Sequence, residues 1–370
     1  MRRLPLLFAL VFGFLNLGFG PPAVVDVTEA SVPLYPSQTR QVGDIRPPAV
    51  GAEAYAVLEH LTGRLIVGKN AHRRLAPAST TKIASAVVAL ERGRLDETVQ
   101  VEVDSRELAD SSVMGLLPGE MLTLRDLLYG LLLPSGNDAA IAIARHVGGS
   151  EERFVAMMND KAAALGLRDT HFVNPHGLDH PDHYASAYDL AMLARYAMNN
   201  PTFAAIVSTR EYAAVGTLRR YDMRNTNPLL FAEAGVDGVK TGYTERAKQA
   251  LVTSAVRNGQ RVLVAVLRSD DRVADTVPLL NHFFANYSCG DLELPRNSLN
   301  AVGTVDGRGR HIGPLPVPRV CLPNWQWPFV RSTVWLDDEV PPAWGDEARL
   351  GFVGFYLGGR LLAEAPVYGR

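Results

Sequence analysis

Three short groups of polar residues have the types and spacing that nucleophilic catalysis requires. Ser79 and Lys82 form the pattern S-x-x-K, Ser135 and Asn137 form S-x-N, and Lys240 begins K-T-G. A serine hydroxyl is a weak nucleophile until a neighbouring base takes its proton, and a lysine becomes such a base when burial or a second cation lowers its pKa. One such pattern is common by chance, whereas all three in this order predict a serine that its substrate acylates.

The spacing within the first two patterns suggests a role for each side chain. Three positions apart at the start of a helix, Ser79 and Lys82 share one face with about 5–6 Å between their Cβ atoms. We therefore expect Ser79 to attack and Lys82 to act as the general base. Because Pro134 breaks the preceding helix, Ser135 and Asn137 are expected on a turn beside the nucleophile. There Ser135 would pass a proton to the leaving amine, and Asn137 would bind Lys82 or the substrate amide.

The third pattern is expected on a strand that binds an extended peptide by backbone pairing. Lys240 and Thr241 would hold a terminal carboxylate of the substrate, and Gly242, which has no side chain, would let the substrate approach closely. The backbone N–H groups of Ser79 and Tyr243 would form an oxyanion hole. The predicted substrate-binding residues are therefore Lys240, Thr241, Gly242 and Tyr243.

The strands and helices that would position these residues follow one another within residues 51–287. Apolar segments at 55–58 and 65–67 flank Thr62-Gly63, and those at 251–256 and 261–267 flank Asn258-Gly259, so each pair predicts a β-hairpin. Helices are expected between the hairpins: 83–90 ending at Gly93, 123–133 with Thr123 and Asp126 as a capping box, 138–147, 150–165 capped by Ser150, and 186–200 capped by Ser186 with Asp189 and ended by Pro201. This order predicts an α+β fold, in which one antiparallel sheet packs with helices.

The length of the chain and its net charge limit the possible domain organisation and binding partners. A chain of 370 residues is too long for one compact core. We expect a signal peptide at 1–20, a linker at 21–50, the domain of sheet and helices at 51–287, and a small β-rich domain at 288–370. The formal net charge is 37 − 39 = −2 and no half of the chain is strongly basic, which disfavours a nucleic-acid partner.

The N-terminal residues indicate that the protein is exported, and export bears on the state of the two cysteines. Arg2 and Arg3 precede an apolar run that ends near Gly20, which is the layout of a secretory signal peptide. An uncleaved anchor stays open, although the run is short for a membrane span. Either way, the remainder is expected to be exported, to the periplasm or the extracellular space. There Cys289 and Cys321 could form one disulfide, but the sequence alone does not show that they meet.

Longer stretches of sequence surround the three patterns. They are Pro77-Ala-Ser-Thr-Thr-Lys-Ile83, Ser135-Gly-Asn-Asp-Ala-Ala140, Asn174-Pro-His-Gly-Leu-Asp179 and Gly235-Val-Asp-Gly-Val-Lys-Thr-Gly-Tyr-Thr244. These stretches resemble the low-molecular-weight penicillin-binding proteins of the D-alanyl-D-alanine carboxypeptidase type, peptidase family S11, over about residues 50–287. The resemblance implies a β-lactamase/transpeptidase-like module that removes the terminal D-alanine from peptidoglycan stem pentapeptides. It also implies covalent inhibition by β-lactam antibiotics and no cofactor or metal.

The chain departs from that family in two places. Where the family usually has Ala-Gly, Lys248 follows Ala247, so a long cation would stand beside the cleft. Residues 288–370 do not clearly match the family's usual second domain, and their end reads as a strand hairpin of 350–357 and 361–368 around Gly358-Gly359. No C-terminal amphipathic anchor is evident, and a peripheral association with a membrane is left open.

A metal site is the first rival interpretation. Zinc takes histidine and carboxylate ligands, and five such residues lie close together in the sequence: His171, His176, His180, Asp182 and His183. Their spacing does not match the helical H-E-x-x-H arrangement. We therefore expect no metal here, and expect His176 to hold the loop beneath the site.

Other rivals share the nucleophile or lack catalysis altogether. A class A β-lactamase would need a glutamate that activates a water for deacylation, and neither Glu211 nor Glu233 has the sequence context of that residue. A D,D-endopeptidase would use the same three patterns. A non-catalytic sensor of cell-wall peptides would use the aromatic run 325–329 as a docking patch, although such a run more often forms the core of a small β domain.

Overall fold

The computed structural model describes residues 24–25, 45–108, 110–293, 312–314, 316–337 and 349–369. The chain divides into a larger unit, Gly43–Cys289 with Cys321–Asn324, and a smaller unit, Gly290–Val320 and Trp325–Arg370 with Met1–Val42. The expected signal peptide at 1–20 and most of the expected linker at 21–50 lie outside the described residues. We keep the domain boundaries 51–287 and 288–370 as a proposal.

A five-stranded antiparallel sheet forms the centre of the larger unit, in the order β3-β2-β10-β9-β8. Its strands are β2 (Ala54–Glu59), β3 (Leu65–Lys69), β8 (Val236–Thr244), β9 (Lys248–Arg257) and β10 (Gln260–Ser269). Both expected hairpins are confirmed, and so is their union in one sheet. Strand β8 lies at one edge of this sheet.

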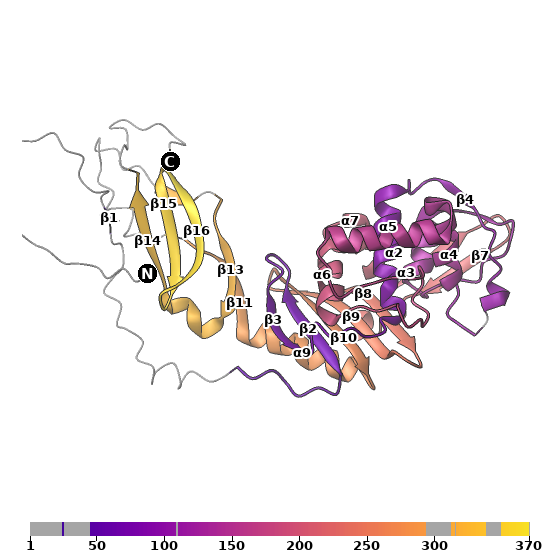
Figure 1. Cartoon of the computed structure of the whole chain (residues 1–370), viewed down its shortest axis with the longest axis horizontal. Helices are drawn as coiled ribbons and strands as arrows, with labels where there is room; N and C mark the ends of the chain where they lie inside the picture. The colour runs from indigo at the N-terminus through magenta and orange to yellow at the C-terminus, as the bar shows by residue number, and fades with distance from the viewer. Residues whose placement is uncertain are drawn as a thin grey trace, which may run out of the picture. The chain divides into compact units, whose positions relative to one another are not determined.

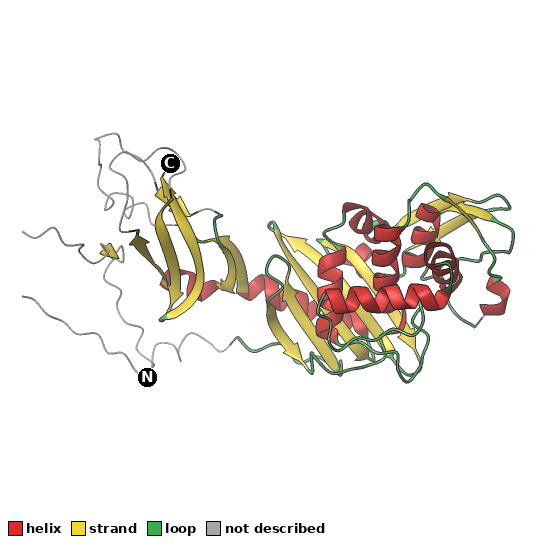
Figure 2. Ribbon diagram, turned by 45° about the horizontal axis from the view of Figure 1, so that its top comes forward, coloured by secondary structure: helices red, strands yellow, loops and turns green. Residues whose placement is uncertain are grey.

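The sheet is covered by helices on both faces (Figure 2). Along β10, Leu263, Ala265 and Leu267 pack with the main helical layer, whereas Val262 and Val264 pack with the helix α9 (Arg272–Asn286) on the opposite face. Because successive side chains of a strand point to opposite faces, two covered faces require an apolar residue at nearly every position. This explains the continuous apolar runs of the central strands.

The helical layer contains the buried helix that begins at Lys82 (Figure 1). Its helices are α2 (Lys82–Arg92), α3 (Leu124–Leu132), α4 (Asn137–Gly148), α5 (Glu151–Ala164), α6 (Ala187–Ala197) and α7 (Pro201–Ser208). The expected capping box of Thr123 and Asp126 is confirmed, and the Ser150 and Ser186 hydroxyls accept backbone N–H bonds at their helix starts. Small elements complete the unit: η1 (Ala78–Thr81), η2 (Ser105–Leu108), β4 (Thr98–Gln100), β5 (Met121–Thr123), β6 (Glu211–Val215), β7 (Arg220–Arg224) and α8 (Leu229–Ala232).

Three expectations about helix ends need correction. Helix α6 ends at Ala197, and Pro201 begins α7 at its first position, where a proline has no N–H to lose. Gly93 follows α2 with an extended backbone, and a Cβ there would collide with Leu124 Cδ2, so close packing requires this glycine. Asp189 does not return a bond to Ser186 N–H, because its carboxylate accepts from Asp169 N–H and Thr170.

The smaller unit contains an antiparallel sheet in the order β1-β14-β15-β16-β12. Its strands are β1 (Val24–Val25), β12 (Ile312–Pro314), β14 (Val330–Leu336), β15 (Arg349–Leu357) and β16 (Arg360–Gly369). The hairpin expected around Gly358-Gly359 is thereby confirmed. Val334, Val353, Phe355, Ala365 and Val367 form its core with Leu292 and Leu350, while the run at 325–329 lies in the 3₁₀ segment η4 (Asn324–Phe329).

The two cysteines meet. Strands β11 (Tyr287–Asp291) and β13 (Arg319–Pro323) form a two-stranded sheet, and Cys289 is bonded to Cys321 in a disulfide. Within the described ranges, no helix combines the length and the apolar character that crossing a membrane would need.

Candidate active site

Ser79 and Lys82 lie where η1 runs into α2. Lys82 is 0% exposed, and its Nζ lies 2.9 Å from Ser79 Oγ, 2.6 Å from Asn137 Oδ1 and 2.7 Å from the His176 carbonyl oxygen. Burial lowers the pKa of Lys82 well below its usual value, the positive charge of Lys240 lowers it further, and Asp138 opposes the shift. A buried amine whose neutral form is favoured in this way can accept the proton of a neighbouring hydroxyl.

The S-x-N pattern forms the turn between α3 and α4, as expected. Ser135 has a backbone φ of +69°, a left-handed value that is uncommon for a residue with a side chain. Its Oγ is buried and is among the described side-chain atoms that have no hydrogen-bond partner. Asn137 begins α4 and donates its backbone N–H to Ser112 O at 2.8 Å. The turn thus brings a hydroxyl with unused bonding capacity and an amide to the site that contains Lys82.

Lys240 is the second buried cation of the site. It lies on the edge strand β8, is 1% exposed, and donates from Nζ to the Thr241 carbonyl oxygen at 3.1 Å. Burial lowers its pKa to about 7, with a smaller contribution from the charge of Arg272. Thr241 Oγ1 lies 2.8 Å from Thr226 Oγ1. These hydroxyl and ammonium groups are suited to binding an anion.

Gly242 and Tyr243 continue β8 past the nucleophile. A Cβ at Gly242 would lie 3.1 Å from Ala78 Cβ and 3.2 Å from the Ser79 backbone nitrogen, so a glycine lets β8 pass η1 closely without displacing it. Tyr243 is 58% exposed, and its hydroxyl donates to Glu245 at 3.0 Å. The backbone of β8 therefore lies beside the N–H of Ser79, as an oxyanion hole requires.

Arg272 is a site residue that no sequence pattern indicated. This first residue of α9 donates from Nη1 to the Gly242 carbonyl oxygen at 3.1 Å, and its charge acts on Lys240. Asp271 caps α9 and would have indicated the start of a helix. Contact with a residue 30 positions earlier, however, follows from the packing of α9 on a face of the sheet, which no local pattern reveals.

The segment 174–178 lies directly beneath the nucleophile. Gly177 has a φ of +93°, and a Cβ there would collide with the Ala78 carbonyl oxygen. The Pro175 carbonyl accepts from Ser85 Oγ at 2.5 Å, and the His176 carbonyl accepts from Lys82. The segment therefore contacts η1 and α2 through its backbone.

The histidines of the rival metal site do not converge. His171 Nδ1 lies 2.7 Å from Asp182 O, and His183 lies between Val173 N–H and Thr81 Oγ1. Burial lowers the pKa of His176 to about 3 and that of His183 to about 4. Across the described part of the chain, the only group of ligand types that is close enough for an ion is Glu59 with Cys289 and Cys321, and these cysteines form the disulfide.

Lys248, the departure noted in the sequence, is engaged in an ion pair. Its Nζ lies 2.8 Å from Asp270 Oδ1, and both side chains are exposed. An exposed pair of this kind contributes little to stability.

Known proteins are similar to this chain in sequence and in fold. The family model for D-alanyl-D-alanine carboxypeptidase, peptidase S11, matches residues 41–271. The Bacillus subtilis D-alanyl-D-alanine carboxypeptidase DacF is 32% identical over 85% of this chain and 84% of its own length, and Escherichia coli DacD is 37% identical over 61% of this chain and 60% of its own length.

Two solved structures resemble the fold. Penicillin binding protein 6B from Escherichia coli is 30% identical, with a TM-score of 0.71 over 87% of this chain and 96% of that chain. The Streptomyces K15 DD-transpeptidase is 35% identical, with a TM-score of 0.61 over 65% of this chain and 99% of that chain. The likeness to 6B extends beyond the part of the chain that the K15 enzyme matches.

Proposed function

Because the chain belongs to the D-alanyl-D-alanine carboxypeptidase family, we propose that it hydrolyses the terminal D-alanine from peptidoglycan stem pentapeptides through an acyl-enzyme on Ser79. One observation carries the proposal: Lys82 Nζ, fully buried and with a strongly lowered pKa, lies 2.9 Å from Ser79 Oγ. Burial favours the neutral form of such a lysine, and the neutral amine can act as a general base.

Acylation follows from these positions. Ser79 Oγ attacks the carbonyl carbon of the penultimate D-alanine, and the hydroxyl proton passes to Lys82 Nζ. The oxyanion of the tetrahedral intermediate lies near the N–H groups of Ser79 and Tyr243. When the C–N bond breaks, Ser135 gives its hydroxyl proton to the leaving amine and takes up the proton that Lys82 Nζ had accepted, so Lys82 is neutral again. D-alanine departs, and an ester remains on Ser79. Asn137 holds Lys82 in place through its 2.6 Å contact.

Deacylation returns the enzyme to its starting state. Water attacks the ester carbonyl and Lys82 takes its proton. The bond to Ser79 Oγ then breaks, and the proton returns to the serine. The released peptide is one residue shorter and carries a new carboxylate.

Lys240, Thr241 and Arg272 select the substrate. A substrate that ends in D-alanine presents a carboxylate, and two cations with a hydroxyl beside one of them can bind such a group. Gly242 leaves room for the peptide backbone along the edge of β8. We further propose that the chain is exported after cleavage of residues 1–20, acts in the periplasm or outside the cell, and is acylated by β-lactams.

The test is the intact mass of residues 21–370, followed over time after mixing with benzylpenicillin. A single adduct that maps to Ser79 and persists for minutes supports the proposal. An adduct that disappears within seconds indicates a β-lactamase, and the absence of an adduct indicates the sensor hypothesis. Release of D-alanine from a pentapeptide, compared with cleavage of a cross-linked dimer, then separates a carboxypeptidase from a D,D-endopeptidase.

A further inference from the structure

A buried carboxylate beside the S-x-N turn has no part in the steps above. Asp138, the second residue of α4, is 0% exposed. Its Oδ1 accepts the N–H of Met114 at 2.8 Å, and its Oδ2 accepts those of Gly115 at 2.7 Å and Leu116 at 2.8 Å. Oδ1 also accepts from Ala139 N–H at 2.9 Å. Three successive N–H groups of the 112–116 segment thus converge on one side chain, which fixes the position of that segment.

The same segment packs on the turn that contains Ser135. Asn137 donates its N–H to the Ser112 carbonyl oxygen at 2.8 Å. A Cβ at Gly136 would lie 2.9 Å from Met114 N and 2.7 Å from Asp138 Oδ1, so the two backbones are in close contact. A side-chain-bearing residue at the φ of Ser135 persists only where its surroundings enforce that conformation. The segment held by Asp138 is part of those surroundings.

Asp138 also carries a charge that Lys82 senses. The atoms within bonding distance of Lys82 Nζ are Ser79 Oγ, Asn137 Oδ1 and the His176 carbonyl oxygen, and none of them is a carboxylate. Among the charged groups that act on it, Lys240 on β8 lowers the pKa of Lys82, and Asp138 on α4 raises it. The ring of His176 is neutral at pH 7, since its pKa is about 3. Asp138 is therefore the anion that opposes Lys240 at this site.

We propose that Asp138 is a positioning residue of the active site: it holds the 112–116 segment against the S-x-N turn, so that Ser135 and Asn137 face Lys82, and its charge balances that of Lys240. The inference rests on the acyl-enzyme chemistry proposed above. Acylation of the unmodified protein, measured first in the same series, separates a failure of that chemistry from a failure of this inference.

The test is Asp138→Asn, which nearly keeps the shape but removes the charge and places an N–H₂ against backbone donors. The rate constant for acylation by benzylpenicillin should fall about 10- to 100-fold at pH 7, because a small displacement of a catalytic group has effects of that size. The rate should also begin to rise at lower pH than in the unmodified protein. Without the negative charge Lys82 loses its proton more easily, and a purely structural defect would not shift this pH dependence.

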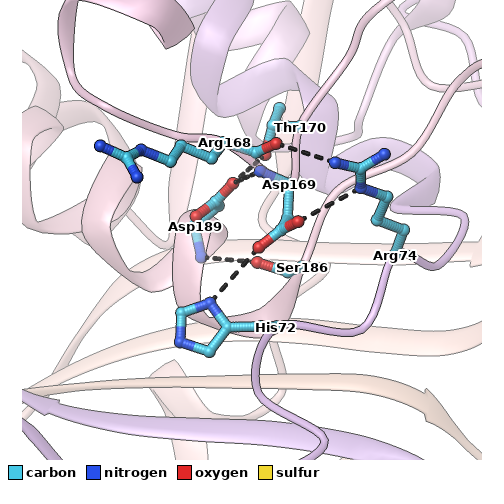
Figure 3. Close-up of polar contacts among 7 residues, drawn as sticks. All are labelled: His72, Arg74, Arg168, Asp169, Thr170, Ser186 and Asp189. Carbon is cyan, nitrogen blue, oxygen red and sulfur yellow. Dashed lines mark hydrogen bonds and ion pairs between the residues drawn. The ribbon is translucent and has the colours of Figure 1, made fainter.

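A matched control is Asp189→Asn (Figure 3). Asp189 is 2% exposed and likewise holds a loop, accepting from Asp169 N–H at 2.8 Å and from Thr170 Oγ1 at 2.9 Å. It is not among the groups that shift the pKa of Lys82. This variant should keep the acylation rate within about twofold, because the Asp189 carboxylate is bonded to Asp169 and Thr170 rather than to the S-x-N turn, and it should keep the pH midpoint. The same losses in both variants would show a general effect of burying an amide and overturn the proposal.

Hydrogen exchange in the unmodified protein tests the proposal even if Asp138→Asn does not fold. In the unmodified protein, the N–H groups of Met114, Gly115 and Leu116 should exchange slowly despite lying outside any helix or strand, because each donates to a buried oxygen. Exchange as fast as in an exposed loop would contradict the proposal. So would a folded Asp138→Asn protein whose acylation rate and pH midpoint are both unchanged.

Discussion

Two lysines of this site lie where water is largely excluded, and this burial decides their chemistry. An ammonium that loses its hydration becomes a weaker cation and a better base, so Lys82 is driven towards its neutral form. Lys240, with a pKa of about 7, is close to the point of balance. The two side chains therefore suit opposite roles, one accepting a proton and the other binding an anion.

Ser79→Ala tests the nucleophile. Loss of one hydroxyl should abolish the benzylpenicillin adduct, because no bond can form without Oγ. The fold should persist, since the replaced group is small. Intact mass reports the adduct, and circular dichroism on heating reports the fold. Ser208→Ala, an exposed serine of α7, is the control and should acylate normally; a surviving adduct on Ser79→Ala would place the nucleophile elsewhere.

Lys240→Arg tests the anion-binding role. The rate constant for acylation at low concentrations of an anionic β-lactam reports on the free enzyme. It should fall as the pH rises through about 7, because the cation at position 240 loses its proton there. An arginine stays protonated, so the decline in the variant should move up by more than about one pH unit. Declines at the same pH in both proteins would assign the ionisation to another group.

At the scale of elements, the sequence predicted those parts of the site that local geometry fixes. The S-x-x-K spacing predicted that Ser79 and Lys82 lie together at a helix start, and Pro134 predicted a break before Ser135. Both features depend on local sequence, and the structure contains both. Arg272 was missed because its contact with Gly242 joins the start of α9 to the edge strand β8. Likewise, the role of Gly177 depends on the approach of another backbone, Ala78. Contacts between distant segments leave no periodic signal in either segment.

Gly177→Ala tests how the 174–178 segment supports η1. A methyl group would collide with the Ala78 carbonyl and would have to be held at a positive φ. We expect a loss of unfolding free energy of about 3 kcal/mol or more and slower acylation, measured by denaturant titration and penicillin adduct formation.

Gly166→Ala is the matched control for that variant. Gly166 has a φ of +70° but nothing within 4 Å of an added Cβ. The Gly166→Ala protein should lose only the unfolding free energy that backbone strain at a positive φ costs, about 1–2 kcal/mol. Its acylation rate should not change. Equal losses of unfolding free energy and equal acylation rates in the two variants would mean that the contact with Ala78 is unimportant.

For the molecule as a whole, the order of strands and helices predicted the sheet of the larger unit. The two hairpins had clear turns, and their apolar runs indicated burial. The sequence did not reveal that β10 is followed by α9, although Asp271 caps that helix. Pro278 lies inside α9, and a proline there argues against a helix until tertiary packing supports it. The pairing of the cysteines could not be predicted from the sequence either, because 32 positions separate them and only the fold brings them together.

Removing the disulfide tests its contribution to stability. Replacing both Cys289 and Cys321 by serine opens a loop with a separation of 32 residues, which should lower the unfolding free energy by about 4 kcal/mol if loop entropy dominates. Thermal unfolding with and without a reductant provides the measurement. The acylation rate should stay the same, since the disulfide joins β11 to β13, which carry none of the proposed site residues. A change in that rate would reveal a coupling between the disulfide and the site.

The edge position of β8 has one more consequence. Among the described strands, none pairs with its outer side, so its unpaired N–H and C=O groups invite any extended chain, including the same strand of a second copy. A second sheet that docked there would bring no carboxylate to Lys240, whose side chain is already buried. A peptide with a free C-terminus brings its own counter-charge. By this difference in charge, Lys240 would favour a peptide with a free C-terminus over a second copy of the strand at this edge.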